Sequence, residues 1–186
     1  MRASAQVCRI MEGVMSNKSM NVIAEALMRQ LGERPFEEIS ISQICENAAV
    51  ARKTFYNNFG SKEAVVEHVA QKLLQVYQEM IAEEKADSLK DMAYLYFCFG
   101  ERFGKVLSVF IENNLFYLFV KQFDEMLPAI NTLLFGDKIN EMGDENLKYV
   151  FAFNSAGVNR LLEIWIETGM GKTPREMGDI YNSITK

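Results

Sequence analysis

The chain has 186 residues and a formal net charge of −5, and 49% of its residues are hydrophobic. A chain of this length forms one domain or two small ones, and its apolar residues are ample for a buried core. It has no run of about 18 uncharged apolar residues, as a membrane-spanning helix requires. No apolar block of signal-peptide length follows Arg2 and Arg9, so we expect a cytoplasmic protein. The widely spaced Cys8, Cys45 and Cys98 fit reduced thiols.

The charges are distributed unevenly along the chain. Residues 1–62 hold eight Lys/Arg and six Asp/Glu, a net charge of +2, whereas residues 63–186 hold twelve Lys/Arg and nineteen Asp/Glu, a net charge of −7. This asymmetry predicts a weakly basic N-terminal module on an acidic body. Because +2 is a small charge, any interaction with nucleic acid must depend on where the basic residues stand.

Residues 1–16 lack helical periodicity and are rich in methionine. We expect them to be a leader outside the folded protein, either disordered or an artefact of an upstream start codon. In the second case Met15 or Met20 is the natural start. An intact N-terminus containing Arg2, detected by mass spectrometry of the native protein, would contradict that assignment.

Helical signals dominate the next segment. A first helix is predicted from residue 17 or 18 to Leu31, where Gly32 supplies a stop. Ser40 is a good N-cap for a second helix that ends near Asn47, and a third begins near Ala51. A fourth helix is predicted over residues 62–84, long enough to join this module to the rest of the chain.

The remainder also reads as helical. Aromatic residues crowd the segment 94–123, which we interpret as two or three helices with a break near 112–114. Residues 136–143 are the most loop-like interval, and a long helix follows over about 144–168. Thr173-Pro-Arg-Glu176 has the pattern of a capping box and opens the last helix. The predicted fold is therefore all-α, with an N-terminal three-helix module joined by a long helix to a C-terminal helical domain.

Residues 40–63 carry the functional signal. The apolar positions of the two short helices can face inward, which leaves Arg52, Lys53, Thr54, Tyr56 and Lys62 on one outer surface. A basic, hydrogen-bonding helix held on a small apolar helix pair is what entry into a DNA major groove requires.

These residues resemble the helix-turn-helix of TetR-type transcriptional regulators. The matching blocks are Ala48-Ala49-Val50-Ala51, Thr54-Phe55-Tyr56-Asn57-Asn58-Phe59 and Ser61-Lys62-Glu63, and the resemblance covers about residues 18–65 without gaps. Gly157, Trp165, Gly169 and residues 173–176 are similar, more loosely, to a C-terminal domain common among such regulators. The resemblance implies a DNA-binding domain at 17–64 and an effector-binding and dimerisation domain at 65–186.

The resemblance implies a homodimeric regulator that binds a palindromic operator in double-stranded DNA. Repression is the family's usual action, relieved by a small-molecule effector, and the last two helices, about 144–168 and 174–185, form the dimer. Two positions depart from the pattern. Ala49 replaces the usual glycine of the turn, at a cost of about 1 kcal/mol if that residue must take a positive φ. Ala51 replaces the usual capping residue, at a cost of about 0.5–2 kcal/mol.

Three sets of site residues follow. The predicted DNA contacts are the polar residues around the recognition helix: Ser40, Ser42, Arg52, Lys53, Thr54, Tyr56, Asn57 and Lys62. A pocket for an apolar or amphipathic effector would be lined by some of the aromatic residues Tyr94, Phe97, Phe103, Phe116, Phe119 and Phe123. For each of them, packing in the core is the competing interpretation. The predicted dimer contacts are Val158, Leu161, Leu162, Trp165 and Ile180.

The sequence offers no support for an enzyme. It has no GxSxG, Walker, HExxH or dinucleotide-binding motif, and His68 is the only histidine, without companions at metal-ligand spacing. We therefore expect no catalytic residues, metal or cofactor. The alternative function is a co-regulator or interaction protein that keeps the fold without binding DNA, which Ala49 and Ala51 favour and the retained basic residues oppose.

Overall fold

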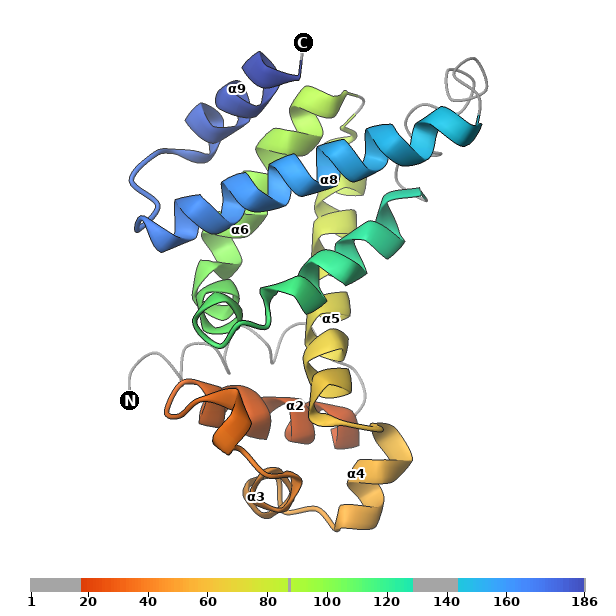
Figure 1. The fold of residues 1–186 in the computed structure, drawn as a ribbon, viewed down its shortest axis with the longest axis vertical. Coiled ribbons are helices and arrows are strands. Elements are labelled where there is room, and N and C mark those ends of the chain that lie inside the picture. The colour runs from red at the N-terminus through yellow and green to blue at the C-terminus, as the bar shows by residue number, and fades with distance from the viewer. Residues whose placement is uncertain (1–17, 87, 129–143, 186) are drawn as a thin grey trace. The chain divides into compact units, whose positions relative to one another are not determined.

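The computed structural model describes residues 18–86, 88–128 and 144–185, and within these ranges every regular element is a helix (Figure 1). This confirms the all-α prediction. The expected leader, residues 1–16, and the expected loop, residues 136–143, lie outside the described residues. The elements are α2 (Lys18–Leu31), the 3-10 turn η1 (Phe36–Glu38), α3 (Ile41–Asn47), α4 (Arg52–Asn58), α5 (Lys62–Glu84), α6 (Leu89–Glu112), a helical segment at 116–128, α8 (Asp144–Glu167) and α9 (Pro174–Ile184).

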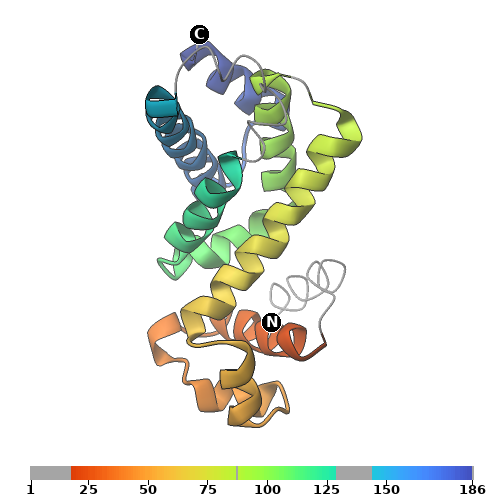
Figure 2. The same ribbon diagram turned by 90° about the vertical axis from the view of Figure 1, so that its right-hand side faces the viewer.

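The chain divides into two compact units. Among the described residues, the first contains residues 18–73 together with Lys105–Phe119, and the second contains the described residues of 74–104 and those from Val120 onward. Helix α5 is a single unbroken helix (Figure 2) that contributes its first half to one unit and its second half to the other. The division into a DNA-binding domain at 17–64 and an effector-binding and dimerisation domain at 65–186 stays a prediction.

The first unit is built on the apolar faces of α2, α3 and α4. Ile23 and Leu27 of α2, Ile44 of α3 and Phe55 of α4 are each completely buried. Phe59, the residue directly after α4, packs its ring 6.0 Å from that of Phe55. Three short helices therefore share one small core, with α4 held at its edge.

An aromatic cluster forms the core of the second unit. The ring of Tyr96 lies 5.2 Å from Tyr77, 6.0 Å from Phe99 and 5.0 Å from Phe123. The Tyr77 hydroxyl donates to the carbonyl of Met92 at 3.0 Å. Burial raises the pKa of Tyr77 and of Tyr96 far above the usual value for tyrosine, so both hydroxyls stay neutral donors.

Buried polar side chains tie α8 into this cluster. The Tyr96 hydroxyl donates to Asn159 Oδ1 at 2.7 Å. Asn159 Nδ2 in turn donates to Ser155 Oγ at 3.2 Å, and that hydroxyl donates to Asp124. Asn159 and Ser155 are both nearly inaccessible to solvent. Because each buried group has a partner, the chain of hydrogen bonds fixes the register of α8 against α6 and the segment 116–128.

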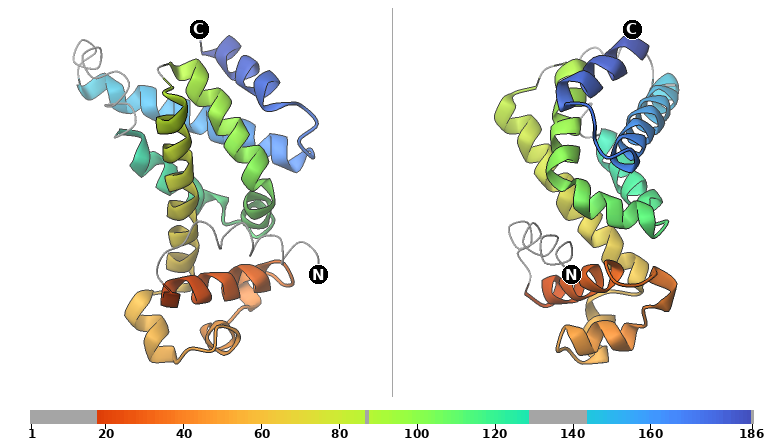
Figure 3. Two further views of the ribbon diagram at one scale, coloured as in Figure 1. Left: turned by 180° about the vertical axis from the view of Figure 1, so that it is seen from behind. Right: turned by 90° about the vertical axis from the view of Figure 1, so that its left-hand side faces the viewer.

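Close helix packing in the second unit depends on small residues. A Cβ on Gly100 would lie 2.4 Å from Leu162 Cδ1, so the glycine lets α6 and α8 approach each other. A Cβ on Gly178 would lie 3.3 Å from the Tyr94 backbone, where α9 meets α6 (Figure 3). The predicted cap of α9 is present, because Glu176 N donates to Thr173 Oγ1 at 3.3 Å and Thr173 N donates to Glu176 Oε2 at 2.7 Å.

Candidate nucleic-acid interface

A tight turn joins α3 to α4. The amide of Val50 donates to the carbonyl of Cys45 at 3.0 Å, and the amide of Ala49 donates to Glu46 at 3.1 Å. This pair of bonds is the Schellman arrangement, which requires a left-handed residue after the helix. Ala49 takes that conformation, with φ 52. Residue 49 therefore takes the positive φ at which an alanine is strained and a glycine would not be.

Helix α4 begins without a side-chain cap. Ala51 stands at the N-cap with φ −71 and ψ 148, the extended conformation that a capping serine or threonine adopts. Its carbonyl accepts the amides of Thr54 and Phe55 at 2.9 and 3.2 Å. The backbone is thus arranged for a cap, and the hydroxyl that would complete it is missing from the sequence.

Restoring the two pattern residues is expected to stabilise the first unit. Ala49→Gly should raise the free energy of unfolding by about 1 kcal/mol, because glycine adopts a positive φ without steric cost. Ala51→Ser should raise it by about 0.5–2 kcal/mol through a new cap. Urea denaturation followed by circular dichroism measures both. Ala48→Gly is the matched control: Ala48 has an ordinary right-handed φ of −84, so glycine should destabilise there, and a gain would contradict the interpretation.

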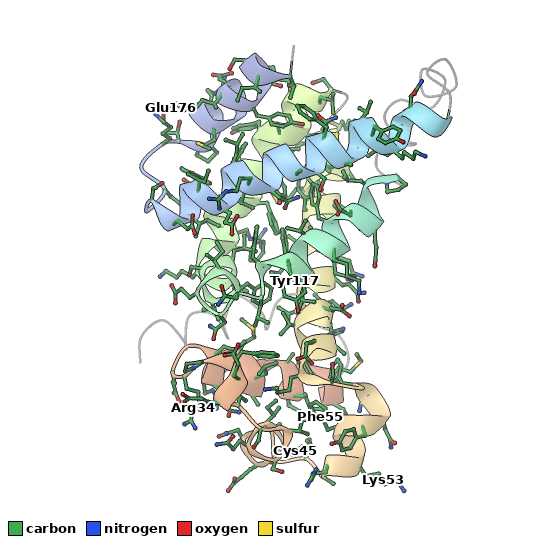
Figure 4. All side chains as sticks on the ribbon, in the orientation of Figure 1. Arg34, Cys45, Lys53, Phe55, Tyr117 and Glu176 are labelled. Atoms are coloured by element: carbon green, nitrogen blue, oxygen red, sulfur yellow. The ribbon has the colours of Figure 1, made fainter. Side chains whose placement is uncertain are left out.

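Helix α4 presents a polar face. Arg52, Lys53, Tyr56 and Asn57 are exposed, and Thr54 is half-buried. Their spacing, two adjacent residues followed four positions later by two more, places them on one side of the helix. Figure 4 shows Lys53 projecting away from the module while Phe55 points into it. The structure therefore brings Arg52, Lys53, Tyr56 and Asn57 together on one surface, with Thr54 half-buried beside them.

The other three predicted contacts have different surroundings. Ser42 is exposed on α3. Ser40 caps α3, with its Oγ accepting the amide of Gln43 at 3.2 Å and donating to Gln43 Oε1 at 2.8 Å. Lys62 directs its ammonium to the carbonyls of Phe36 and Ile39, at 2.7 and 2.6 Å. For Lys62 no sequence pattern signals these carbonyl partners, since they depend on the path of the residues between α2 and α3.

The second unit contains a partly open cavity of about 50 Å³. Of the six aromatic residues predicted to line an effector site, Phe123 lines this cavity. Phe97 and Phe103 are buried in side-chain packing, and Phe116 stacks on Phe119 in the first unit. Tyr94 is exposed beside the Arg175 guanidinium, 5.6 Å from its ring. The lining residues are Tyr77, Leu89, Met92, Ala93, Tyr96, Phe123, Leu127, Phe151, Asn154, Ser155, Val158 and Tyr181.

The predicted dimer residues divide by exposure. Val158, Leu162 and Trp165 are buried inside the second unit, whereas Leu161 and Ile180 are partly exposed. Large apolar side chains that sequence reasoning missed are exposed on α8 and α9. A surface groove of about 240 Å³ includes two of them, and its lining residues are Phe153, Gly157, Arg160, Leu161, Tyr181, Ile184 and Thr185. The large apolar residues exposed on the described parts of these two helices are Tyr149, Phe153, Ile164 and Ile184.

In the described ranges no group of three or more His, Cys, Asp and Glu side chains is placed to hold a metal ion. None of the helices in those ranges is long and apolar enough to cross a membrane.

The capped α3, the tight turn and the polar face of α4 define a helix-turn-helix DNA-binding protein. Residues 23–69 match the family model described as bacterial regulatory proteins, tetR family. Residues 23–69 are therefore similar to the DNA-binding domain of TetR-type regulators, which supports a DNA-binding transcriptional regulator. No curated protein matches the sequence.

Proposed function

We propose that the chain is a cytoplasmic repressor that binds a palindromic operator as a homodimer and is released by a small-molecule effector. The observation that carries the proposal is the exposed Arg52, Lys53 and Tyr56 face of α4, backed by the fully buried Phe55. Arg and Lys side chains at the start of such a helix can donate to guanine O6 and N7. A two-fold dimer would place two such helices about 34–36 Å apart, one turn of DNA.

Removing either basic side chain is the direct test. Arg52→Ala or Lys53→Ala should weaken specific binding by about 1–3 kcal/mol if the side chain reads a base. The measurement is fluorescence anisotropy with a duplex that the wild-type chain selects from a randomised library. Lys90→Ala is the control, because Lys90 is an exposed lysine of the second unit. Wild-type affinity in both α4 variants would contradict the groove assignment.

The homodimer is proposed through α8 and α9. Supporting it, Phe153 and Ile184 are 65% and 62% exposed and line the same groove, and an exposed apolar patch of this kind is typical of an interaction surface. In a two-fold interface each residue would be buried twice. From the predicted dimer contacts we keep the partly exposed Leu161 and Ile180. To these we add the exposed residues Tyr149, Phe153, Ile164 and Ile184.

The effector is proposed to be small, uncharged and largely apolar. Among the residues that the structure describes, no charged side chain lines the 50 Å³ cavity of the second unit, and burying an unpaired ion there would be costly. The cavity holds no more than a few waters, so an effector would have to displace the helices around it. Thermal unfolding with phenol or indole should show stabilisation, and benzoate should not. Stabilisation by benzoate alone would contradict the proposed ligand class.

The alternative function is a co-regulator with a TetR fold that does not bind DNA. It is favoured by the strained Ala49, with φ 52, and by the uncapped start of α4 at Ala51. Selection from a randomised duplex library separates the two functions. Enrichment of a palindromic duplex supports the repressor, whereas no enrichment of any duplex supports the co-regulator.

A further inference from the structure

The peptide groups of Phe36 lie at a junction in the first unit. The Phe36 amide donates to Asn113 Oδ1 at 3.0 Å, and its carbonyl accepts the Lys62 ammonium at 2.7 Å. The same ammonium reaches the carbonyl of Ile39 at 2.6 Å and lies 4.3 Å from the centre of the Phe36 ring. Phe36 itself is buried, so these backbone groups depend on protein partners. We call Phe36, Lys62 and Asn113 the Phe36 clamp.

The asparagine of the clamp is held firmly. Its Nδ2 donates to the carbonyl of Val109 at 2.9 Å and approaches that of Leu31, the last residue of α2, at 3.4 Å. Asn113 directly follows the end of α6, and the next residue, Asn114, takes φ 56 to turn the chain. One amide side chain therefore connects the end of α6 to both ends of the link between α2 and η1.

The clamp bears on the DNA-binding surface through chain connectivity. The 3-10 turn that begins at Phe36 leads through Ile39 to Ser40, the residue that caps α3. Helix α3 packs on α4, which presents Arg52 and Lys53. A shift of the Phe36 peptide would thus change where α3 begins, and with it the placement of the polar face.

We propose that Asn113 and Lys62 are positioning residues for operator binding, acting by fixing the Phe36 peptide rather than by touching DNA. The inference rests on the proposed function, since it presupposes that the chain binds an operator. Asn113 is assigned this indirect role because it follows α6 and lies outside the helix-turn-helix. Lys62 is assigned the same role because two carbonyls and an aromatic face already surround its ammonium.

The test combines local exchange with operator affinity. In Asn113→Leu, hydrogen exchange in peptides covering residues 32–40 should be about tenfold faster, because a buried amide loses its acceptor. Operator affinity should fall about tenfold at a temperature where circular dichroism shows the variant folded. Asn113→Asp keeps an acceptor for the Phe36 amide and should retain more protection than the leucine variant. If the leucine variant does not fold, the exchange and operator affinity of Asn113→Asp are compared with those of wild type instead. Asn114→Gly, which suits the positive φ, is the matched control and should behave as wild type.

Salt dependence separates the two roles open to Lys62. In Lys62→Met, affinity should fall while the slope of log affinity against log salt stays as in wild type. A slope less steep by about one would instead identify a phosphate contact and overturn the Lys62 assignment. Unchanged exchange and unchanged affinity in both Asn113 variants would overturn the clamp. If the wild-type chain selects no duplex, the proposed function fails, and the exchange experiment still tests whether Asn113 holds the Phe36 peptide.

Discussion

Phe55→Ala is expected to unfold the DNA-binding module and to abolish operator binding. Phe55 is completely buried on the inner face of α4, and its ring packs against Phe59 at 6.0 Å. Truncating a buried phenylalanine to alanine costs about 3–5 kcal/mol, which includes the cavity that remains. A core formed by three short helices has a small free energy of unfolding, so this loss is comparable with the total stability of the module. Urea denaturation followed by circular dichroism measures the change.

The adjacent residue is a matched control for this substitution. Tyr56 is also an aromatic residue of α4, and its ring stands edge-on to Phe55 at 5.6 Å, but it is 51% exposed. Tyr56→Ala should therefore change the free energy of unfolding by less than about 1 kcal/mol while weakening DNA binding. Equal loss of stability in the two variants would contradict the orientation of α4. Full operator binding by a folded Tyr56→Ala protein would remove Tyr56 from the proposed contacts.

The local elements of this fold could be predicted because their signals are local. Ser40 and Thr173 were expected as N-caps, and both form complete capping boxes with the glutamine or glutamate three residues later. The break expected near residues 112–114 falls where α6 ends at Glu112, followed by the positive φ of Asn114. Caps and turns involve residues within one helical turn of each other, so a single sequence contains the whole interaction.

The partners of Lys62 could not be predicted because they are distant in sequence. The ammonium of Lys62 bonds to carbonyls 26 and 23 residues away, and helical periodicity assigns a residue to a face without saying what lies opposite. The surroundings of the aromatic residues in the segment 94–123 could not be predicted for the same reason. Phe116 and Phe123 are seven residues apart, yet one packs in the first unit and the other lines the cavity of the second.

Trp165→Ala is expected to destabilise the second unit itself, by about 3–5 kcal/mol. Trp165 is only 3% exposed, and its ring stands edge-on to Phe97 at 5.7 Å. Its Nε1 donates to the carbonyl of Lys172 at 3.0 Å, so the substitution also removes a hydrogen bond at the turn between α8 and α9. Thermal unfolding should show the loss at every protein concentration, because these contacts are made within one chain.

Phe153→Glu is the opposite case on the same helix. Phe153 is 65% exposed beside the apolar groove of α8 and α9, so glutamate should cost the isolated chain little. A two-fold interface would lose the burial of two phenylalanines, about 3–6 kcal/mol in total, which raises the dimer dissociation constant at least a hundredfold. Sedimentation equilibrium should then find monomers of a folded protein at micromolar concentration. A Phe153→Glu dimer as tight as wild type would place the interface elsewhere. If Trp165→Ala separated the subunits without loss of unfolding free energy, Trp165 would be an interface residue and the sequence-based assignment would stand.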